Sequence, residues 1–388
     1  MAAIRSPSPA DSPATRALAS VGIIVGDSPV RLWGMTPAER LRRTLARAGV
    51  PERQVEEAPA GGSALVLRGD WVFDESLVRA LAARPGLALA ASTGEAVAAH
   101  VAGPLAATAG RWLQGGDAGA PPPGLVLVGA EALVSDYNVA LRKREPAMLV
   151  RLTRESAPAV EARMFGGSYK GVTDFVTKHV WPAPAKAVTR QCAQAGITPN
   201  QVTLLSAVLT VAAFVLFWRG AFGWGLACAW AMTFLDTVDG KLARVTLTSS
   251  KWGNVFDHGL DLVHPPFWWW AWIVGLQAGA TPLADPGPVL AVVVAGYVAQ
   301  RLQEGLFLAR HRLEIHIWRR FDSRFRLVTA RRNPNLAILT LATAAGRPDL
   351  GMAAVAVWTV ASFAVHAVQI VQAEAARRRG PIVSWMAG

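Results

Sequence analysis

Six apolar stretches follow one another in the second half of this chain, and they constrain its fold more than any other feature. A helix needs about 20 residues to cross the hydrocarbon core of a bilayer. The predicted spans are 201–218, 222–242, 255–275, 288–308, 336–345 and 351–371, of which the fifth is short. A soluble core would not need such stretches, so residues 201–373 are predicted to form an all-α membrane domain of six helices.

Basic residues gather in the loops on one side of these spans. The loops after the second and fourth spans and the segment after the sixth are rich in Lys and Arg, whereas the opposite loops carry little beyond Arg219 and Arg347. Basic loops face the cytoplasm. We therefore expect a multi-pass protein of a bacterial inner membrane, with the soluble domain and the active site on the cytoplasmic side. The net charge of +12 fits anionic lipids or substrates better than nucleic acid.

The first 165 residues have the mixed composition of a soluble domain. Residues 1–17 are rich in Ser, Pro and Ala and lack the apolar core of a signal peptide, so we expect a disordered tail there. Within 18–165, strand-like segments alternate with helical ones; the strands are 20–26, 64–68, 87–91 and 124–128, and the helices 36–49 and 74–83. This alternation predicts an open α/β sheet with helices on both faces.

Two connecting segments flank the membrane domain. Residues 166–200 mix basic and apolar side chains, which is typical of an amphipathic helix and linker at the membrane surface, and residues 374–388 are predicted to be a basic cytoplasmic tail. An ordinary interdomain helix explains the first segment equally well.

An acidic pattern lies between the second and third spans, in the sequence LDTVDGKLARVTLTSSKWGNVFDHGLD. One helical face carries Asp236, Asp239, Gly240, Ala243 and Arg244, because their spacing is i, i+3, i+4, i+7 and i+8. The next helix carries Gly253, Asp257 and Asp261 at i, i+4 and i+8. Two helices joined by a short turn can therefore direct four carboxylates toward one another.

Four carboxylates at the edge of a membrane repel one another unless cations neutralise them. Oxygen ligands favour Mg²⁺ or Mn²⁺ over zinc, and two such ions can hold a diphosphate between them. Glycines admit a bulky ligand near the backbone, and Arg244 can donate two hydrogen bonds to a phosphate. A solvated helix end or a salt-bridge network explains this combination less well.

The pattern resembles the signature of the CDP-alcohol phosphatidyltransferase family, D-x2-D-G-x2-A-R-x8-G-x3-D-x3-D, at every fixed position. The resemblance extends from about Ser168 and includes the sequence ITPNQVT at 197–203. It implies that a phospho-alcohol or phosphatidyl group passes from a CDP-alcohol to an acceptor hydroxyl, with release of CMP. It also implies that the four aspartates bind two metal ions, that Asp261 is the catalytic base, and that the CDP pocket is formed by Asp236, Gly240, Ala243, Arg244 and Gly253.

The soluble domain resembles the sugar-nucleotide type of nucleotidyltransferase, as in chains that fuse an inositol-phosphate cytidylyltransferase to such a transferase. The resemblance rests on the opening strand, the sequence VRLWGMTPAERLRRTLARAG and the sequence LVLRGDW. Asp70 falls where that family places a metal-binding aspartate. The family's glycine-rich phosphate loop is replaced here by GDSPVRLWG, so we expect a degenerate domain. A bifunctional enzyme that makes its own CDP-alcohol is the alternative.

The sequence says less about which residues bind the acceptor. Four basic residues are candidates to bind an acceptor phosphate: Lys170, Arg190, Arg331 and Arg332. The resemblance implies phospholipid or inositol-phosphate-type lipid synthesis and a homodimer in the lipid bilayer. A lipid acceptor remains an alternative, and so does a protein of another class, a membrane ion transporter, because acids within spans also mark ion paths.

Overall fold

The computed structural model describes residues 18–115, 121–138, 142–249 and 251–387, and all their side chains except those of 251–258 and 260. The tail expected at 1–17 lies outside the described residues. The chain divides into two compact units. Residues up to Gly167, apart from 139–143, belong to the first unit, and residues from Ser168 onward, apart from 245–247, belong to the second.

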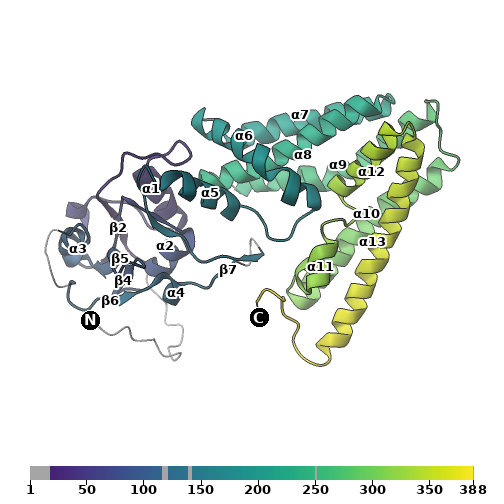
Figure 1. Ribbon diagram of the computed structural model, residues 1–388. Helices are drawn as coiled ribbons and strands as arrows, with labels where there is room; N and C mark the ends of the chain where they lie inside the picture. The colour runs from purple at the N-terminus through teal and green to yellow at the C-terminus, as the bar shows by residue number, and fades with distance from the viewer. Residues whose placement is uncertain (1–17, 116–120, 139–141, 250, 388) are drawn as a thin grey trace. The chain divides into compact units, whose positions relative to one another are not determined.

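The first unit is built around a five-stranded mixed sheet of order β1-β2-β5-β4-β6 (Figure 1). Strand β5 is antiparallel to both of its neighbours, whereas the pairs β1–β2 and β4–β6 are parallel. The elements are β1 (Val21–Val25), α1 (Pro37–Arg47), η1 (Val55–Glu57), β2 (Ser63–Arg68), β3 (Trp71–Phe73), α2 (Glu75–Ala82), β4 (Leu87–Ala90), β5 (Ala96–Ala102), η2 (Gly103–Leu105), α3 (Ala106–Leu113), β6 (Val126–Val128), α4 (Ala130–Leu133), β7 (Tyr137–Asn138), β8 (Lys143–Arg144), β9 (Leu149–Arg151) and α5 (Ala157–Gly167).

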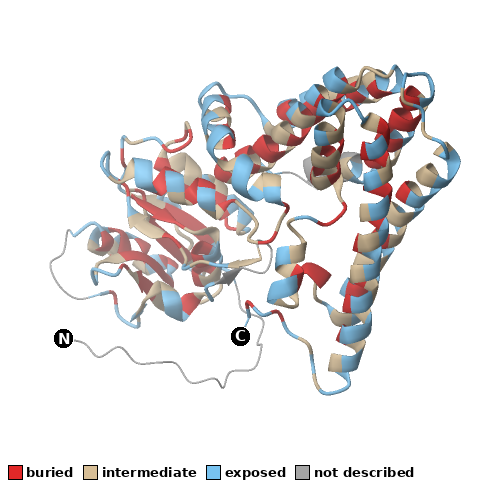
Figure 2. Ribbon diagram, turned by 45° about the vertical axis from the view of Figure 1, so that its right-hand side comes forward, coloured by how far each residue is buried: buried red, intermediate tan, exposed pale blue. Residues whose placement is uncertain are grey.

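Helices cover both faces of this sheet. On one face Leu45 of α1 and Leu77 of α2 pack with Leu65 of β2, and on the other Ala109 of α3 packs with Val66. Figure 2 shows the buried residues gathered on the strands and on the helix faces turned toward them. Alternation along β2 sends Leu65 and Val66 to opposite faces. The mixed α/β architecture predicted from the sequence is therefore present.

Strand β5 was absent from the sequence prediction. Its sequence, AVAAHVA, is dominated by alanine, which is depleted in strands. The strand nevertheless lies in the middle of the sheet, with five consecutive buried residues between β2 and β4. Small side chains suit this position because helices press on both faces, so tertiary packing outweighs the local preference.

The second unit is helical. Its elements are η3 (Val176–Val180), α6 (Pro182–Gln194), α7 (Pro199–Trp218), α8 (Phe222–Val245), α9 (Lys251–Gln277), α10 (Pro286–His311), η4 (Ile315–Ile317), α11 (Arg320–Phe325), α12 (Arg332–Ala344) and α13 (Pro348–Arg377). Among the described residues two helices, α7 and α13, are long and apolar enough to cross a membrane. Helices α8, α9 and α10 reach 24, 27 and 26 residues, but they carry more polar side chains.

A tryptophan cluster forms the core of the helical unit. Trp268, Trp269 and Trp272 of α9 are almost completely buried, whereas Trp270 is 41% exposed. The Trp272 and Phe217 ring centroids lie 4.9 Å apart, and the Trp268 Nε1–H donates to Thr210 O at 3.0 Å. These contacts join α9 to α7, so most of this aromatic stretch serves packing.

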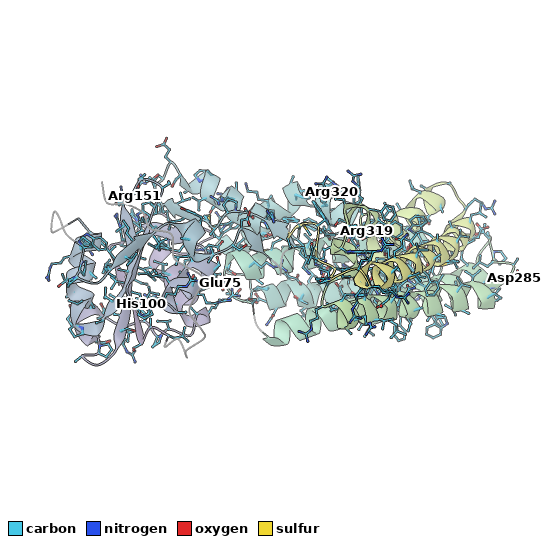
Figure 3. All side chains as sticks on the ribbon, turned by 90° about the horizontal axis from the view of Figure 1, so that it is seen from below. Glu75, His100, Arg151, Asp285, Arg319 and Arg320 are labelled. Atoms are coloured by element: carbon cyan, nitrogen blue, oxygen red, sulfur yellow. The ribbon has the colours of Figure 1, made fainter. Side chains whose placement is uncertain are left out.

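His100 supplies a test of the sheet's pH dependence. It lies in β5 (Figure 3), and its Nδ1–H donates to Leu81 O while Nε2 accepts from Ser63 Oγ, both at 2.9 Å. Burial lowers the pKa of this imidazole. The unfolded chain therefore binds a proton more readily below about pH 6.5, and the stability that His100 contributes is lost as the pH falls through that value.

Hydrogen exchange on the full-length protein measures this effect. Protection factors of β2 and β5 peptides should fall between pH 7.5 and pH 5.5, and they should fall less in His100→Gln, whose amide does not titrate. An unchanged pH dependence in the variant would assign the effect to other groups.

Candidate active site

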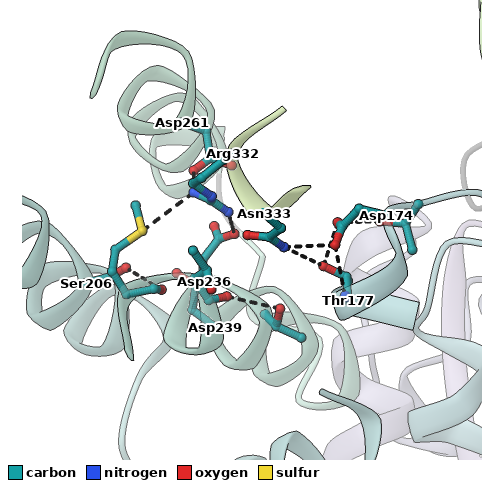
Figure 4. A network of polar contacts seen from close by, with 12 residues as sticks. Asp174, Thr177, Ser206, Asp236, Asp239, Asp261, Arg332 and Asn333 are labelled. Carbon is teal, nitrogen blue, oxygen red and sulfur yellow. Dashed lines mark hydrogen bonds and ion pairs between the residues drawn. The ribbon is translucent and has the colours of Figure 1, made fainter. Parts of the chain in front are cut away.

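Arg332 joins two of the predicted aspartates. Its Nη2 lies 2.5 Å from Asp236 Oδ2, and its Nη1 donates to Asp261 Oδ1 (Figure 4). Asp236 lies on α8, Asp261 on α9 and Arg332 at the start of α12. The exposed fractions of the side chains are 19%, 40% and 15% respectively. One guanidinium thus holds carboxylates from two helices at a common point.

Asp239 lies one helical turn after Asp236 and is 4% exposed. The Thr203 hydroxyl of α7 donates to its Oδ2 at 2.6 Å. Thr203 is placed by the start of α7, where Thr198 and Gln201 form a capping box. The sequence ITPNQVT thereby contacts the acidic cluster directly, a connection that its spacing alone does not reveal.

The other residues predicted for the CDP pocket differ in what the structure shows. Arg244 donates to Gly240 O at 3.1 Å and to Ser168 O at 3.4 Å, so its guanidinium contacts backbone carbonyls. A Cβ on Gly240 would lie 3.5 Å from Arg244 Nη1. Ala243 is partly buried on the same helix. Gly253 lies in the first turn of α9, and the side chain of Asp257 is outside the described side chains.

Asp174 was missed by the sequence analysis, although it orients the helix that carries Arg332. Its Oδ1 accepts from Asn333 Nδ2 at 2.9 Å and from Thr177 N at 3.0 Å (Figure 4). Burial alone would raise the pKa of Asp174, but Arg326 and these hydrogen bonds hold it below its usual value. Asp174 therefore remains a carboxylate that fixes Asn333, and hence the first turn of α12.

A cavity of about 530 Å³ adjoins the aspartates, a size within the range of about 300–1,000 Å³ typical of small-molecule sites. Asp261 and Arg332 belong to its wall. Its other charged residues are Arg142, Lys170, Asp174, Arg301, Glu304, Glu314, Arg326 and Arg331. The cavity wall thus carries six basic and four acidic residues. Of the predicted acceptor residues, Lys170, Arg331 and Arg332 line the cavity, whereas Arg190 is exposed on α6 and does not.

Glu304 is the counter-charge at the centre of this basic wall. Its Oε1 accepts from Arg301 Nη2 at 2.9 Å, from Arg331 Nη2, and from His316 Nε2 at 3.2 Å. Burial holds the pKa of His316 well below its usual value, so the ring is neutral, and its tautomer with the proton on Nε2 donates to Glu304. Burial also lowers the pKa of Lys170, and Arg142 and Arg244 lower it further. An anion in the cavity would relieve that repulsion.

Ligand atoms of Glu304, His316 and His366 lie within 4.8 Å of one another, as a metal site would require. Two guanidinium groups, from Arg301 and Arg331, already bond the Glu304 carboxylate. A divalent cation bound here would be repelled by both of these guanidinium groups. The surroundings therefore favour an anion over a metal at this point.

Comparison with known proteins supports the predicted resemblance. Residues 196–330 match the family model described as CDP-alcohol phosphatidyltransferase. A phosphatidylinositol phosphate synthase of Streptomyces avermitilis is 32% identical over 111 residues, which are 28% of this chain and 42% of that protein. A bifunctional IPC transferase and DIPP synthase of Rubrobacter xylanophilus is 32% identical over 195 residues, 50% of this chain and 42% of that protein.

An archaetidylinositol phosphate synthase of Pyrococcus horikoshii is 34% identical over 79 residues, 20% of this chain and 42% of that protein. The chain thus spans less than half the length of these relatives. The bifunctional relative agrees in part with the expected fusion. The matched segment contains the whole acidic pattern and ends just before Arg331 and Arg332. Residues 196–330 therefore carry a domain of the CDP-alcohol phosphatidyltransferase family.

Proposed function

We propose that this chain transfers a phospho-alcohol or phosphatidyl group from a CDP-alcohol to the hydroxyl of a phosphorylated polyol, with release of CMP. The observation that carries the proposal is the shared wall between the aspartate cluster and the basic cavity. Asp261 and Arg332 belong to both. A donor bound at the aspartates and an anionic acceptor in the cavity would therefore meet at Asp261.

The carboxylates suit a divalent metal. Asp236, Asp239 and Asp261 offer oxygen donors alone, the ligands that Mg²⁺ and Mn²⁺ prefer, and a metal ion there would replace the Arg332 guanidinium between Asp236 and Asp261. Together with Asp257 we expect them to hold two ions. When bound, such ions would neutralise the diphosphate and stabilise the oxygens exchanged at phosphorus.

Asp261 is the residue best situated to act as the base. Its side chain is 40% exposed and lines the cavity, so an acceptor hydroxyl can reach it. The hydroxyl oxygen would form a bond to the β-phosphorus, its proton would pass to Asp261, and the bond from that phosphorus to CMP would break. Asp239, buried against Thr203, is less accessible to a substrate hydroxyl.

The charge of the cavity favours an anionic acceptor over a neutral lipid alcohol. The cavity wall has two more cations than acids, and five of its six cations are guanidinium groups. Arg binds phosphate by paired hydrogen bonds, so this excess of positive charge matches a phosphate. Two of the relatives above are named as synthases of inositol lipid phosphates. We therefore propose inositol phosphate as the acceptor, with CDP-diacylglycerol or CDP-inositol as the donor. An ion transporter is disfavoured because the described acids adjoin this basic cavity.

We also propose that α7, α8, α9, α10, α12 and α13 are the six spans of a membrane domain with its active site on the cytoplasmic side, and that the protein forms homodimers. Five of these helices have at least 20 residues. Helix α12 has 13, or about 20 Å at 1.5 Å per residue, against a core about 30 Å thick. Its neighbour α13 must therefore shelter part of its length.

The soluble unit is proposed to be catalytically inactive. Asp70 accepts hydrogen bonds from Arg68 Nε at 2.9 Å and Nη2 at 2.6 Å, and it pairs with Arg151 at 3.2 Å, so guanidinium groups take the place of a metal. In the loop that replaces the phosphate loop, Trp33 is buried, has φ 51°, and donates its N–H to Glu161 at 3.0 Å. A side chain thus fills part of this loop region.

The first prediction concerns the base. Purified protein in detergent with Mg²⁺ should release CMP from CDP-diacylglycerol or CDP-inositol when inositol phosphate is present. Asp261→Asn should lower this rate about 100-fold or more, as expected for loss of a general base. Asp285→Asn is the matched control, because Asp285 is exposed at the start of α10 (Figure 3) and should leave the rate unchanged. Equal rates in all three proteins would refute the assignment.

The second prediction concerns the cavity. Arg331→Gln should raise the acceptor KM about tenfold, the loss expected for one charge-assisted hydrogen bond, and should leave the KM of the CDP donor within about twofold. Arg310→Gln serves as control, because Arg310 is an exposed residue bonded to Glu374 at 3.0 Å. A rise in the donor KM instead would place Arg331 in the donor site.

The third prediction concerns the soluble unit. Wild-type protein given CTP, inositol phosphate and Mg²⁺ should release no pyrophosphate, because Asp70 is engaged by Arg68 and Arg151. Pyrophosphate release that disappears in Asp70→Asn would instead establish the bifunctional alternative.

A further inference from the structure

The segment after α13 turns back onto the helical unit. We name residues Pro381–Ala387 the strap. Within it Ser384 and Met386 are 4% and 8% exposed, whereas Val383 is 64% exposed. Ile382 packs against the cluster of Phe307, Ile315 and Ala373. The sequence analysis treated this segment as part of a basic tail, yet its last residues are partly buried.

The strap bonds the backbone of one short segment, residues 316–318. Ser384 Oγ donates to Ile317 O at 2.7 Å, and the Trp385 N–H donates to Trp318 O at 3.1 Å. The Trp385 indole Nε1–H donates to Ser323 Oγ at 2.9 Å, and that hydroxyl donates to His316 O at 2.8 Å. Three consecutive carbonyls are thus bonded by the strap or by a residue that the strap contacts.

This segment continues from a wall of the basic cavity, to which its first residue, His316, belongs. Glu314, Ile315 and His316 line it, and so does Arg326, which follows α11. The element η4 has only three residues, too short to be held by its own hydrogen-bond ladder. Contacts from outside η4 therefore hold His316 in position against Glu304. The position of Arg331 depends on the same contacts, because Arg331 bonds the same carboxylate.

Arg319 and Arg320, both labelled in Figure 3, follow this segment in the chain and add further contacts. Arg319 bonds Asp322 Oδ1 at 2.9 Å and Gln372 Oε1 at 2.7 Å, which joins it to α13. The Arg320 guanidinium lies 5.3 Å from the centre of the Trp385 ring, within range of a cation–π contact. Plain coverage of an apolar surface would not require polar contacts at successive backbone positions.

We propose that the strap, through Ser384 and Trp385, positions the 314–326 wall of the cavity and so sets the affinity for the anionic acceptor. This inference rests on the proposed function. Ser384 and Trp385 are positioning residues, because they do not line the cavity themselves. Their loss should loosen the acceptor site and leave the aspartate cluster intact.

Kinetics and hydrogen exchange test the strap together. In Ser384→Ala/Trp385→Ala the acceptor KM should rise about 5- to 10-fold, as expected when hydrogen bonds that hold a site are lost, while kcat and the donor KM stay within about twofold. Amide exchange over 312–327 should accelerate. Trp385→Phe, which keeps an aromatic ring and loses the Nε1–H donor, should lie between the double variant and wild type. Val383→Ala, at the exposed position, should match wild type.

The outcomes separate the two proposals. If wild type releases no CMP with any donor, the proposed function fails, and the strap is then judged by exchange over 312–327 and by whether inorganic phosphate slows it more in wild type than in the double variant. Unchanged exchange and unchanged phosphate protection would overturn the strap. A fall in kcat with an unchanged acceptor KM would also overturn it, because that result would indicate general damage.

Discussion

The bond of Arg332 to Asp236 and Asp261 is the interaction on which the helical unit's site depends. Carboxylates that face one another from two helices repel, and a low dielectric magnifies that repulsion. A guanidinium offers a planar fork that serves two carboxylates at once, which an ammonium group does less well. The positions of α8, α9 and α12 relative to one another are therefore linked through one side chain, and Asp174 holds that side chain's helix by way of Asn333.

In the cavity the charges are reversed, because there one carboxylate holds two guanidinium groups together. Arg301 and Arg331 would repel each other without Glu304, which accepts from both. His316 adds a neutral donor to the same carboxylate, and its ring is held there by a short backbone segment rather than by a long helix. The basic wall thus consists largely of paired charges, and its excess of positive charge is available to bind an anionic ligand. Removing a carboxylate from such a network costs more than removing an exposed charge, because the remaining ions stay buried.

Sequence spacing could predict those parts of the fold and site in which the relevant residues are neighbours on one helix or strand. The helix at 36–49 follows from its caps, the strand at 64–68 from its strand-like sequence, and Asp236 and Asp239 from helical periodicity. The contacts of Asp236 with Arg332, of Asp239 with Thr203, and of Asp174 with Asn333 span 96, 36 and 159 residues. The periodicity of a helix or strand cannot predict contacts between residues so far apart in the sequence. Strand β5 was missed for a related reason, since its alanines suit a crowded sheet centre that only the assembled fold creates.

Asp261 and Arg332 form part of both the acidic cluster and the cavity wall, and this has a thermodynamic consequence. A ligand that changes the charge beside either residue changes the field felt at the other site. Affinities at the two sites are then linked, and the linkage is reciprocal: whatever factor the first ligand imposes on the second, the second imposes on the first. A cation drawn to the aspartates would free positive charge for the cavity, so the metal and the anion would favour each other's binding. The site would behave as a cooperative pair rather than as two independent pockets.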